Sequence, residues 1–224
     1  MTLVRETVAN AAVGVGVADT AEGLNAFLRP GCAAAIWRKE MPSDVERWLG
    51  KLDPDRLPRG RILLPPDSAA ATVAQLCDIA RMPEGPERTW LQSDIVDMVD
   101  MFTTLLPVKM LRLRLDVVTT NACRKFHIDA VNARLVCTYR GTGTQYGVSR
   151  DGADPAHVFT VPTGSPILLR GTLWPTQPAS GLLHRSPPIE GTGETRLVLV
   201  LDPIFDPGEG VEATLAKRVP KRLH

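Results

Sequence analysis

Two residues in the second half of the chain, His127 and Asp129, have the types and spacing of paired metal ligands. They stand two positions apart in "RKFHIDAV", a segment whose pattern predicts a strand at about 126–129. Side chains two apart in a strand point to the same side, so an imidazole and a carboxylate would enter one pocket. The spacing therefore predicts two adjacent ligands, and a third must come from another segment.

His184 is the candidate third ligand. It ends the short apolar run "SGLLH", where a residue at the mouth of a barrel would stand. Two imidazoles and one carboxylate form the facial set that holds non-haem Fe(II) and leaves positions open for substrate and dioxygen. Zinc accepts the same ligands and usually completes a tetrahedron with water. The residues alone predict a metal site and leave the metal open between Fe(II) and zinc.

Arg196 is the candidate anion-binding residue. It begins the most strand-like segment of the chain, "RLVLVLD". A guanidinium is a bidentate partner for a carboxylate, and one held by a strand is already oriented for it. The alternative is an arginine at the end of a strand that faces solvent.

The elements that must position these residues are strands. From about residue 108 the apolar period changes from 3.6 to 2, as in "KMLRLRLDVV", where leucines alternate with charged residues. Further strand-like runs, separated by Gly-rich turns, lie around 126–129, 133–139, 157–161, 166–170, 181–184 and 195–202. Strands at such short intervals predict an antiparallel sandwich or barrel, jelly roll included.

Residues 1–107 have a mainly helical pattern. Ser43 and Ser93 are possible helix N-caps, and "DSAAATVAQLCDIA" and "SDIVDMVDMFTTLL" each carry one apolar face at helical spacing. "GCAAAIWRKE" and "GRILLPP" are short enough to be strands or connectors. We therefore predict an α+β chain: a helical part (1–107) packed on an antiparallel core (108–206), then a tail (207–224).

Taken together, these segments resemble the jelly-roll core, or double-stranded β-helix, of the Fe(II)/2-oxoglutarate-dependent oxygenases. "FHIDAVNARLVCTYRGTGT" resembles their H-x-D strand and hairpin, and "LLHRSPPIEGTGETRLVLVLD" their distal histidine and arginine strand. The chain is still more similar to a bacterial domain family of unknown function, in which H-x-D is followed by R-L-V-x-T-Y-x-G-x-G-T. That likeness covers nearly the whole chain.

The resemblance implies roles for individual residues. His127, Asp129 and His184 would be iron ligands, and Arg196 would pair with the distal carboxylate of 2-oxoglutarate. Tyr139 and Arg134 could also contact that cosubstrate. Alternation puts these two side chains on opposite faces of one strand, so at most one should line the pocket unless a bulge intervenes. Val198 stands where oxygenases of this group often carry serine or threonine.

The resemblance implies a hydroxylase-type oxygenase that uses Fe(II) and 2-oxoglutarate on an unknown substrate. One alternative is a cupin-like metal-binding protein, with zinc in the same site and no oxygenase turnover. The other is an interaction module without catalysis, which Val198 favours.

Composition narrows the possible partners and location. A net charge of +1 gives no strong attraction to nucleic acid or anionic membranes, so we expect neither as a partner. No apolar run is long enough for a membrane helix, and the N-terminus lacks the apolar core of a signal peptide. The four cysteines show no metal-binding spacing and are expected to be reduced thiols of a cytoplasmic protein. The oligomeric state is open.

Overall fold

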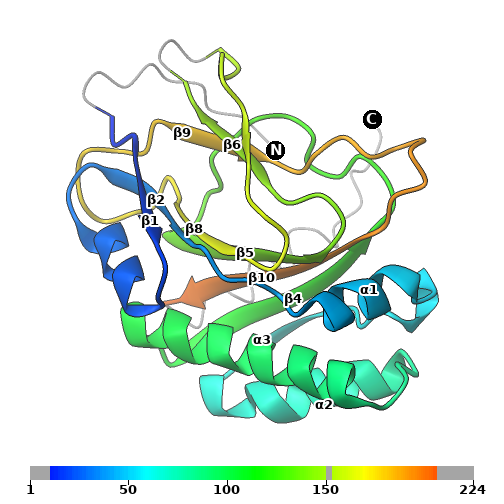
Figure 1. The fold of residues 1–224 in the computed structure, drawn as a ribbon. Coiled ribbons are helices and arrows are strands. Elements are labelled where there is room, and N and C mark those ends of the chain that lie inside the picture. The colour runs from blue at the N-terminus through cyan, green and yellow to red at the C-terminus, as the bar shows by residue number, and fades with distance from the viewer. Residues whose placement is uncertain (1–10, 150–152, 206–224) are drawn as a thin grey trace, which may run out of the picture.

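The structure, a computed structural model, describes residues 11–149 and 153–205 (Figure 1). It is a mixed α+β fold built on a seven-stranded sheet of order β1-β2-β8-β5-β10-β4-β3 and a three-stranded sheet of order β7-β6-β9. The large sheet contains β1 (Gly14–Ala18), β2 (Cys32–Trp37), β3 (Gly60–Leu64), β4 (Met110–Val118), β5 (Ala133–Arg140), β8 (Pro166–Arg170) and β10 (Arg196–Ile204). The small sheet contains β6 (Gln145–Val148), β7 (Phe159–Thr160) and β9 (Leu182–Arg185).

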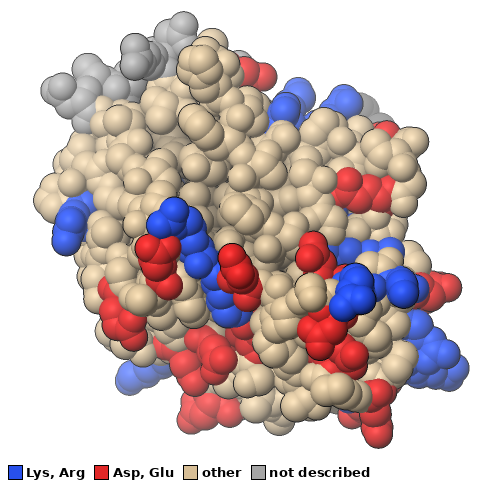
Figure 2. All heavy atoms as spheres, viewed as in Figure 1, with Lys and Arg blue, Asp and Glu red and all other residues tan. Residues whose placement is uncertain are grey.

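The helices cover one face of the large sheet, and the small sheet lies on the other side (Figure 1). They are α1 (Ser43–Lys51), α2 (Ala69–Ile79) and α3 (Pro86–Leu105), with short 3-10 turns η1 (Glu22–Leu28), η2 (Pro54–Arg56) and η3 (Pro66–Ser68). On the outer surface of the helices, basic and acidic side chains are interspersed rather than separated by sign (Figure 2).

The central strand β10 shows how the sequence separates two cores. All nine of its residues are buried, because helices cover one side of the strand and the small sheet faces the other. Leu197, Leu199 and Leu201 join the helix-side core, whereas Val198 and Val200 join a smaller core between the sheets. Because successive side chains of a strand point to opposite faces, this one apolar strand contributes to both cores.

The predicted antiparallel sheet is confirmed, but a mainly helical first half is not. In the described residues each neighbouring pair of the large sheet is antiparallel except β1 and β2, which are parallel. β1 and β2 extend one edge of this sheet, and β3 forms the other edge. The strand β2 reads "CAAAIW" and is buried on both faces, so it carries neither alternation nor helical periodicity.

Helix starts and short strands also differ from expectation. α1 begins at Ser43 with Pro42 in the cap position, and α3 begins at Pro86, so Ser93 lies inside the helix. Proline is favoured at a first helical position because its missing N–H has no partner there anyway. The sequence pattern missed β6, and residues 126–129 form a single bridge rather than a strand.

Two further expectations concern the chain as a whole. None of the described helices is long and apolar enough to cross a membrane. The four cysteines are free thiols, and Cys123 is exposed while the other three are buried. The tail predicted at 207–224 lies outside the described residues.

Candidate metal centre

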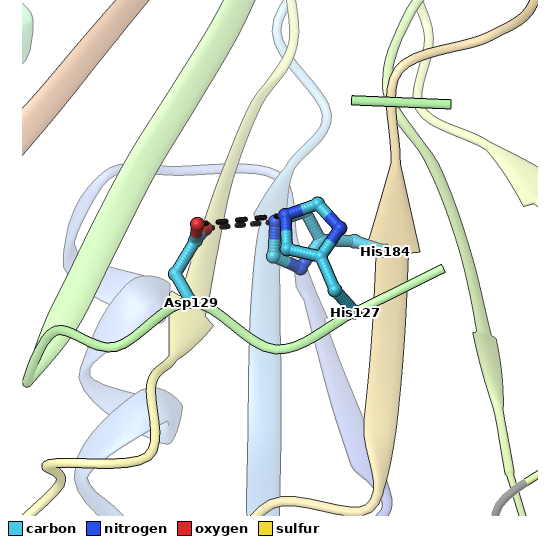
Figure 3. A group of neighbouring side chains, drawn as sticks. All are labelled: His127, Asp129 and His184. Carbon is cyan, nitrogen blue, oxygen red and sulfur yellow. Dashed lines mark ion pairs between the residues drawn. The ribbon is translucent and has the colours of Figure 1, made fainter. Parts of the chain in front are cut away.

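The structure brings His127, Asp129 and His184 together (Figure 3). His184 is part of β9, and His127 forms an antiparallel bridge with it. The backbone N–H of each histidine donates a hydrogen bond to the backbone carbonyl of the other histidine, at 3.0 Å in both cases. Their rings consequently lie side by side, with centroids 4.6 Å apart. Asp129 approaches both rings from the segment that follows His127 (Figure 3).

The donor atoms of the three side chains converge on one point. Nε2 of His184 lies 2.9 Å from Oδ2 of Asp129, and Nε2 of His127 lies 3.5 Å from Oδ1. One ligand atom from each residue lies within 4.8 Å of the others. Three ligands about 2.1 Å from a shared ion lie about 3 Å apart, so small side-chain adjustments complete a coordination shell. The set therefore fits a transition-metal ion.

Neighbouring groups orient the ligands. Nδ1 of His127 donates a hydrogen bond to the Lys125 carbonyl at 2.8 Å, so Nε2 is the ring nitrogen that faces Asp129 and would bind a metal. Nη1 of Arg134 contacts Oδ1 of Asp129 at 2.6 Å. The same guanidinium donates two hydrogen bonds to Asp202, from Nε at 2.6 Å and from Nη2 at 2.9 Å. Arg134 thus ties the carboxylate ligand to the central strand β10.

The electrostatics of the site favour an ionised carboxylate. Burial by itself would raise the pKa of Asp129, but hydrogen bonds from both histidines and the charge of Arg134 outweigh it, so that pKa lies well below its ordinary value. The hydrogen bond with Asp129 raises the pKa of His127. Burial lowers the pKa of His184, which favours the neutral imidazole that a metal requires.

A cavity of about 270 Å³ opens beside the triad. It is lined by Arg61, Arg114, Asp116, Val118, Ala122, Cys123, His127, Arg134, Val136, Thr144, His184, Arg185, Ser186, Arg196, Val198 and Val200. Five arginines and one aspartate in this set give its wall a positive charge. The arrangement suits an anionic small molecule.

Arg196 lies in the wall of this cavity and is only 1% exposed. Its Nε donates to the Thr142 carbonyl at 2.6 Å, and its Nη2 donates to Oγ1 of Thr138 at 3.2 Å. Nη1 makes no hydrogen bond with the described residues. Burial lowers the pKa of Arg196 to about 10, so the guanidinium is still a cation at neutral pH.

Of the two remaining candidates on β5, Arg134 lines the cavity and Tyr139 does not. Tyr139 points to the helix-side core, where its hydroxyl donates to Oδ2 of Asp94 at 2.8 Å. Lys39 forms an ion pair with the same carboxylate. The structure therefore places Tyr139 on the face of β5 that packs against α3, as the alternation along the strand requires.

Sequence reasoning missed several residues that shape the cavity. Thr138 and Thr142 hold Arg196, and Asp202 holds Arg134. The alternation put Arg114 on the charged face of its strand, and this polar side of β4 lines the cavity. The alternation showed that these side chains share a face, but it did not show that this face encloses a site.

Structure comparison gives similar proteins at low identity. The crystal structure of the dioxygenase for auxin oxidation from rice matches with a TM-score of 0.47 and 14% identity, over 82% of this chain and 78% of that chain. The Arabidopsis thaliana dioxygenase for auxin oxidation, in complex with 2-oxoglutarate, matches with a TM-score of 0.43 and 13% identity. The match covers 75% of this chain and 74% of that chain. A Pseudomonas putida prolyl-4-hydroxylase matches with a TM-score of 0.43 and 13% identity, over 84% of this chain and 100% of that chain.

Comparison of the sequence with curated proteins finds no match. A family model, described as "Protein of unknown function (DUF1826)", matches residues 18–202. This match spans the three helices, the triad, the small sheet and the large sheet except most of β1 and the last two residues of β10. The chain therefore belongs to the DUF1826 family.

Proposed function

We propose that this protein is a non-haem Fe(II)/2-oxoglutarate-dependent oxygenase of the hydroxylase type, built on a jelly-roll (double-stranded β-helix) core. The observation that carries the proposal is the convergence of His127, Asp129 and His184 beside a cationic cavity. Two imidazoles and one carboxylate are the facial set of non-haem iron, which leaves positions open for other ligands.

The environment of Asp129 supports a metal ligand. Its Oδ1 is held by Arg134, while Oδ2 is buried and faces Nε2 of His184 at 2.9 Å. A cation between this oxygen and the two imidazoles would compensate the burial of the carboxylate charge. Oδ2 is thus the atom that we expect to bind the ion.

Arg196 would bind the distal carboxylate of 2-oxoglutarate. Its free Nη1 and its low exposure favour a charge-assisted hydrogen bond, because burial strengthens electrostatic interactions. Held by His127, Asp129 and His184, Fe(II) with 2-oxoglutarate would supply the chemistry for oxidising a C–H bond with dioxygen. The chain orients the reactants, and Val198 and Val200 form an apolar wall that limits water.

Val198 does not weaken this assignment, because a neighbouring strand provides the missing hydroxyl. Val198 pairs in register with Thr138, and the Thr138 hydroxyl accepts the hydrogen bond from Arg196. The guanidinium is therefore oriented by β5 instead of by its own strand.

Zinc remains the second candidate, because the same ligands bind it in tetrahedral sites. Elemental analysis of full-length protein purified without added metal separates the two, together with oxygen uptake after Fe(II) and 2-oxoglutarate are supplied. We expect bound iron, or an apo-protein that takes up Fe(II) and consumes oxygen only with 2-oxoglutarate. Stoichiometric zinc that Fe(II) does not replace, with no oxygen uptake, would contradict the oxygenase and leave a metal-binding protein.

A further inference from the structure

The cavity has a second group of cations, separate from Arg196. Arg61 on β3 and Arg114 on β4 are partners in register, and Arg114 is in turn the partner of Val200 on β10. Register partners in a sheet point to the same face, so both guanidinium groups lie on the face that lines the cavity. β3 is one of the two edge strands of the large sheet, so this pair lies near that edge.

These two arginines are incompletely neutralised. Like charges directly opposite each other on neighbouring strands destabilise a sheet. Nε of Arg114 lies 2.9 Å from a carboxylate oxygen of Asp116, but Arg61 forms no ion pair with any described residue. Burial lowers the pKa of Arg114, and the charges of Arg134 and Arg61 lower it further. An anion bound between Arg61 and Arg114 would relieve this repulsion.

Arg196 and this pair occupy different positions along the wall of the cavity. Arg196 pairs with Val118 and Val200 pairs with Arg114, so the two positions differ by four residues along β10 and β4. Four residues of strand span about 13 Å. Arg134, the residue that contacts Asp129, donates to Asp202. Asp202 pairs in register with Arg112, two residues from Arg114. Arg196 and the Arg61–Arg114 pair are therefore two separate cationic positions in the cavity wall.

We propose that the substrate to be oxidised carries a carboxylate or phosphate group that Arg61 and Arg114 bind, an inference that rests on the proposed function. Arg196 then serves the cosubstrate, and the arginine pair fixes the substrate with its reactive C–H bond toward the triad. The cavity of about 270 Å³ suits a small molecule, since drug-sized ligands need pockets of roughly 300 Å³ or more. Nothing in this assignment requires a macromolecular partner.

To test this, metal-free, full-length protein is titrated with inorganic phosphate and, separately, with benzoate, and binding is measured by calorimetry. We expect saturable binding of at least one anion. The anion that binds more tightly identifies the substrate group as a phosphate or a carboxylate. Arg61→Ala and Arg114→Ala should each weaken it about tenfold or more, the loss expected for a hydrogen bond to a charged group. Arg61 is exposed on an edge strand, so its variant stays informative if Arg114→Ala fails to fold.

The matched control is Arg47→Ala, which removes an exposed cation on α1 without touching the cavity. The inference is overturned if neither anion binds saturably, or if Arg47→Ala weakens binding as much as Arg61→Ala does. The response of the Fe(II) protein to 2-oxoglutarate is measured on the same samples and should survive Arg61→Ala. Loss of that response already in the wild type would reject the oxygenase, whereas a normal response without anion binding would reject only this subsite.

Discussion

At the scale of single residues, the site depends on one carboxylate between two imidazoles. We expect His127→Ala and Asp129→Ala each to abolish stoichiometric Fe(II) binding, because two ligands cannot hold the ion at this site as three do. Metal content after dialysis measures the effect, and circular dichroism checks that the sheet is retained.

Asp100→Ala is the matched control for the aspartate, since Asp100 is exposed on α3. That variant should bind Fe(II) as the wild type does. Full metal occupancy in Asp129→Ala would rule out the triad as the binding site.

Arg196 provides an independent test of the cosubstrate. We expect Arg196→Ala to weaken 2-oxoglutarate binding by about 10- to 100-fold, because a charge-assisted hydrogen bond in a buried site is lost. Fe(II) binding should be unchanged, since Arg196 contacts Thr138 and Thr142 rather than the triad. Titration of the anaerobic Fe(II) protein with 2-oxoglutarate, followed by absorption, gives both quantities. An unchanged response in the variant would assign the cosubstrate to another cation.

At the scale of elements, the two faces of β5 have different tasks. Tyr139→Phe removes a buried hydrogen bond to Asp94 on the helix side, so we expect the free energy of unfolding to fall by about 1–2 kcal/mol. Affinity for 2-oxoglutarate should not change, because Tyr139 does not line the cavity. Urea denaturation and the absorption titration measure the two effects. A large loss of cosubstrate affinity at unchanged stability would place Tyr139 in the binding site after all.

The alternation of apolar and polar residues in the sequence was enough to predict the central strands. β4, β5, β8 and β10 lie close to the ranges that alternation and turn signals indicate. It was not enough for β2, because a strand covered on both faces has no polar side to alternate with. Nor was it enough for β1, a short, partly exposed strand that contains two glycines. The strand β6 was missed because it is short and half-buried around Gly147.

The candidate site was predictable only in part. The H-x-D spacing and the apolar run that ends at His184 identified residues that do lie together. The partners of Arg196 come from β5 and the turn after it, and Arg61 comes from a strand at the far edge of the sheet. Such contacts depend on the order of strands in the sheet, which spacing along the chain does not determine.

At the scale of the whole molecule, burial separates the four thiols. We expect a thiol reagent at pH 8 to modify Cys123 alone in the native protein, because the other three cysteines are buried. Cys123→Ser should then abolish native labelling, and denaturation should expose the remaining thiols. Rapid modification of more than one thiol in the native wild type would show that the core opens readily.

Alkaline pH should destabilise the fold through Cys137. Burial raises the pKa of this thiol to about 12, while an unfolded cysteine ionises near its ordinary value of 9.0. The unfolded state therefore loses the proton first, and the stability contributed by Cys137 is present below pH 9 and lost as the pH rises toward 12. Thermal unfolding at pH 8 and pH 10 measures the effect, and Cys137→Ala should show a smaller decrease between them. An equal decrease in both proteins would assign the alkaline loss to other groups.

The backbone bridge between His127 and His184 has a consequence for how an ion would arrive. Two peptide hydrogen bonds, not the imidazoles themselves, hold these segments together. The spacing of the rings is thus preset in the empty protein, and truncating either side chain leaves the bridge intact. Uptake of an ion then requires dehydration and proton release rather than a rearrangement of the chain, so loading should proceed without a slow folding phase.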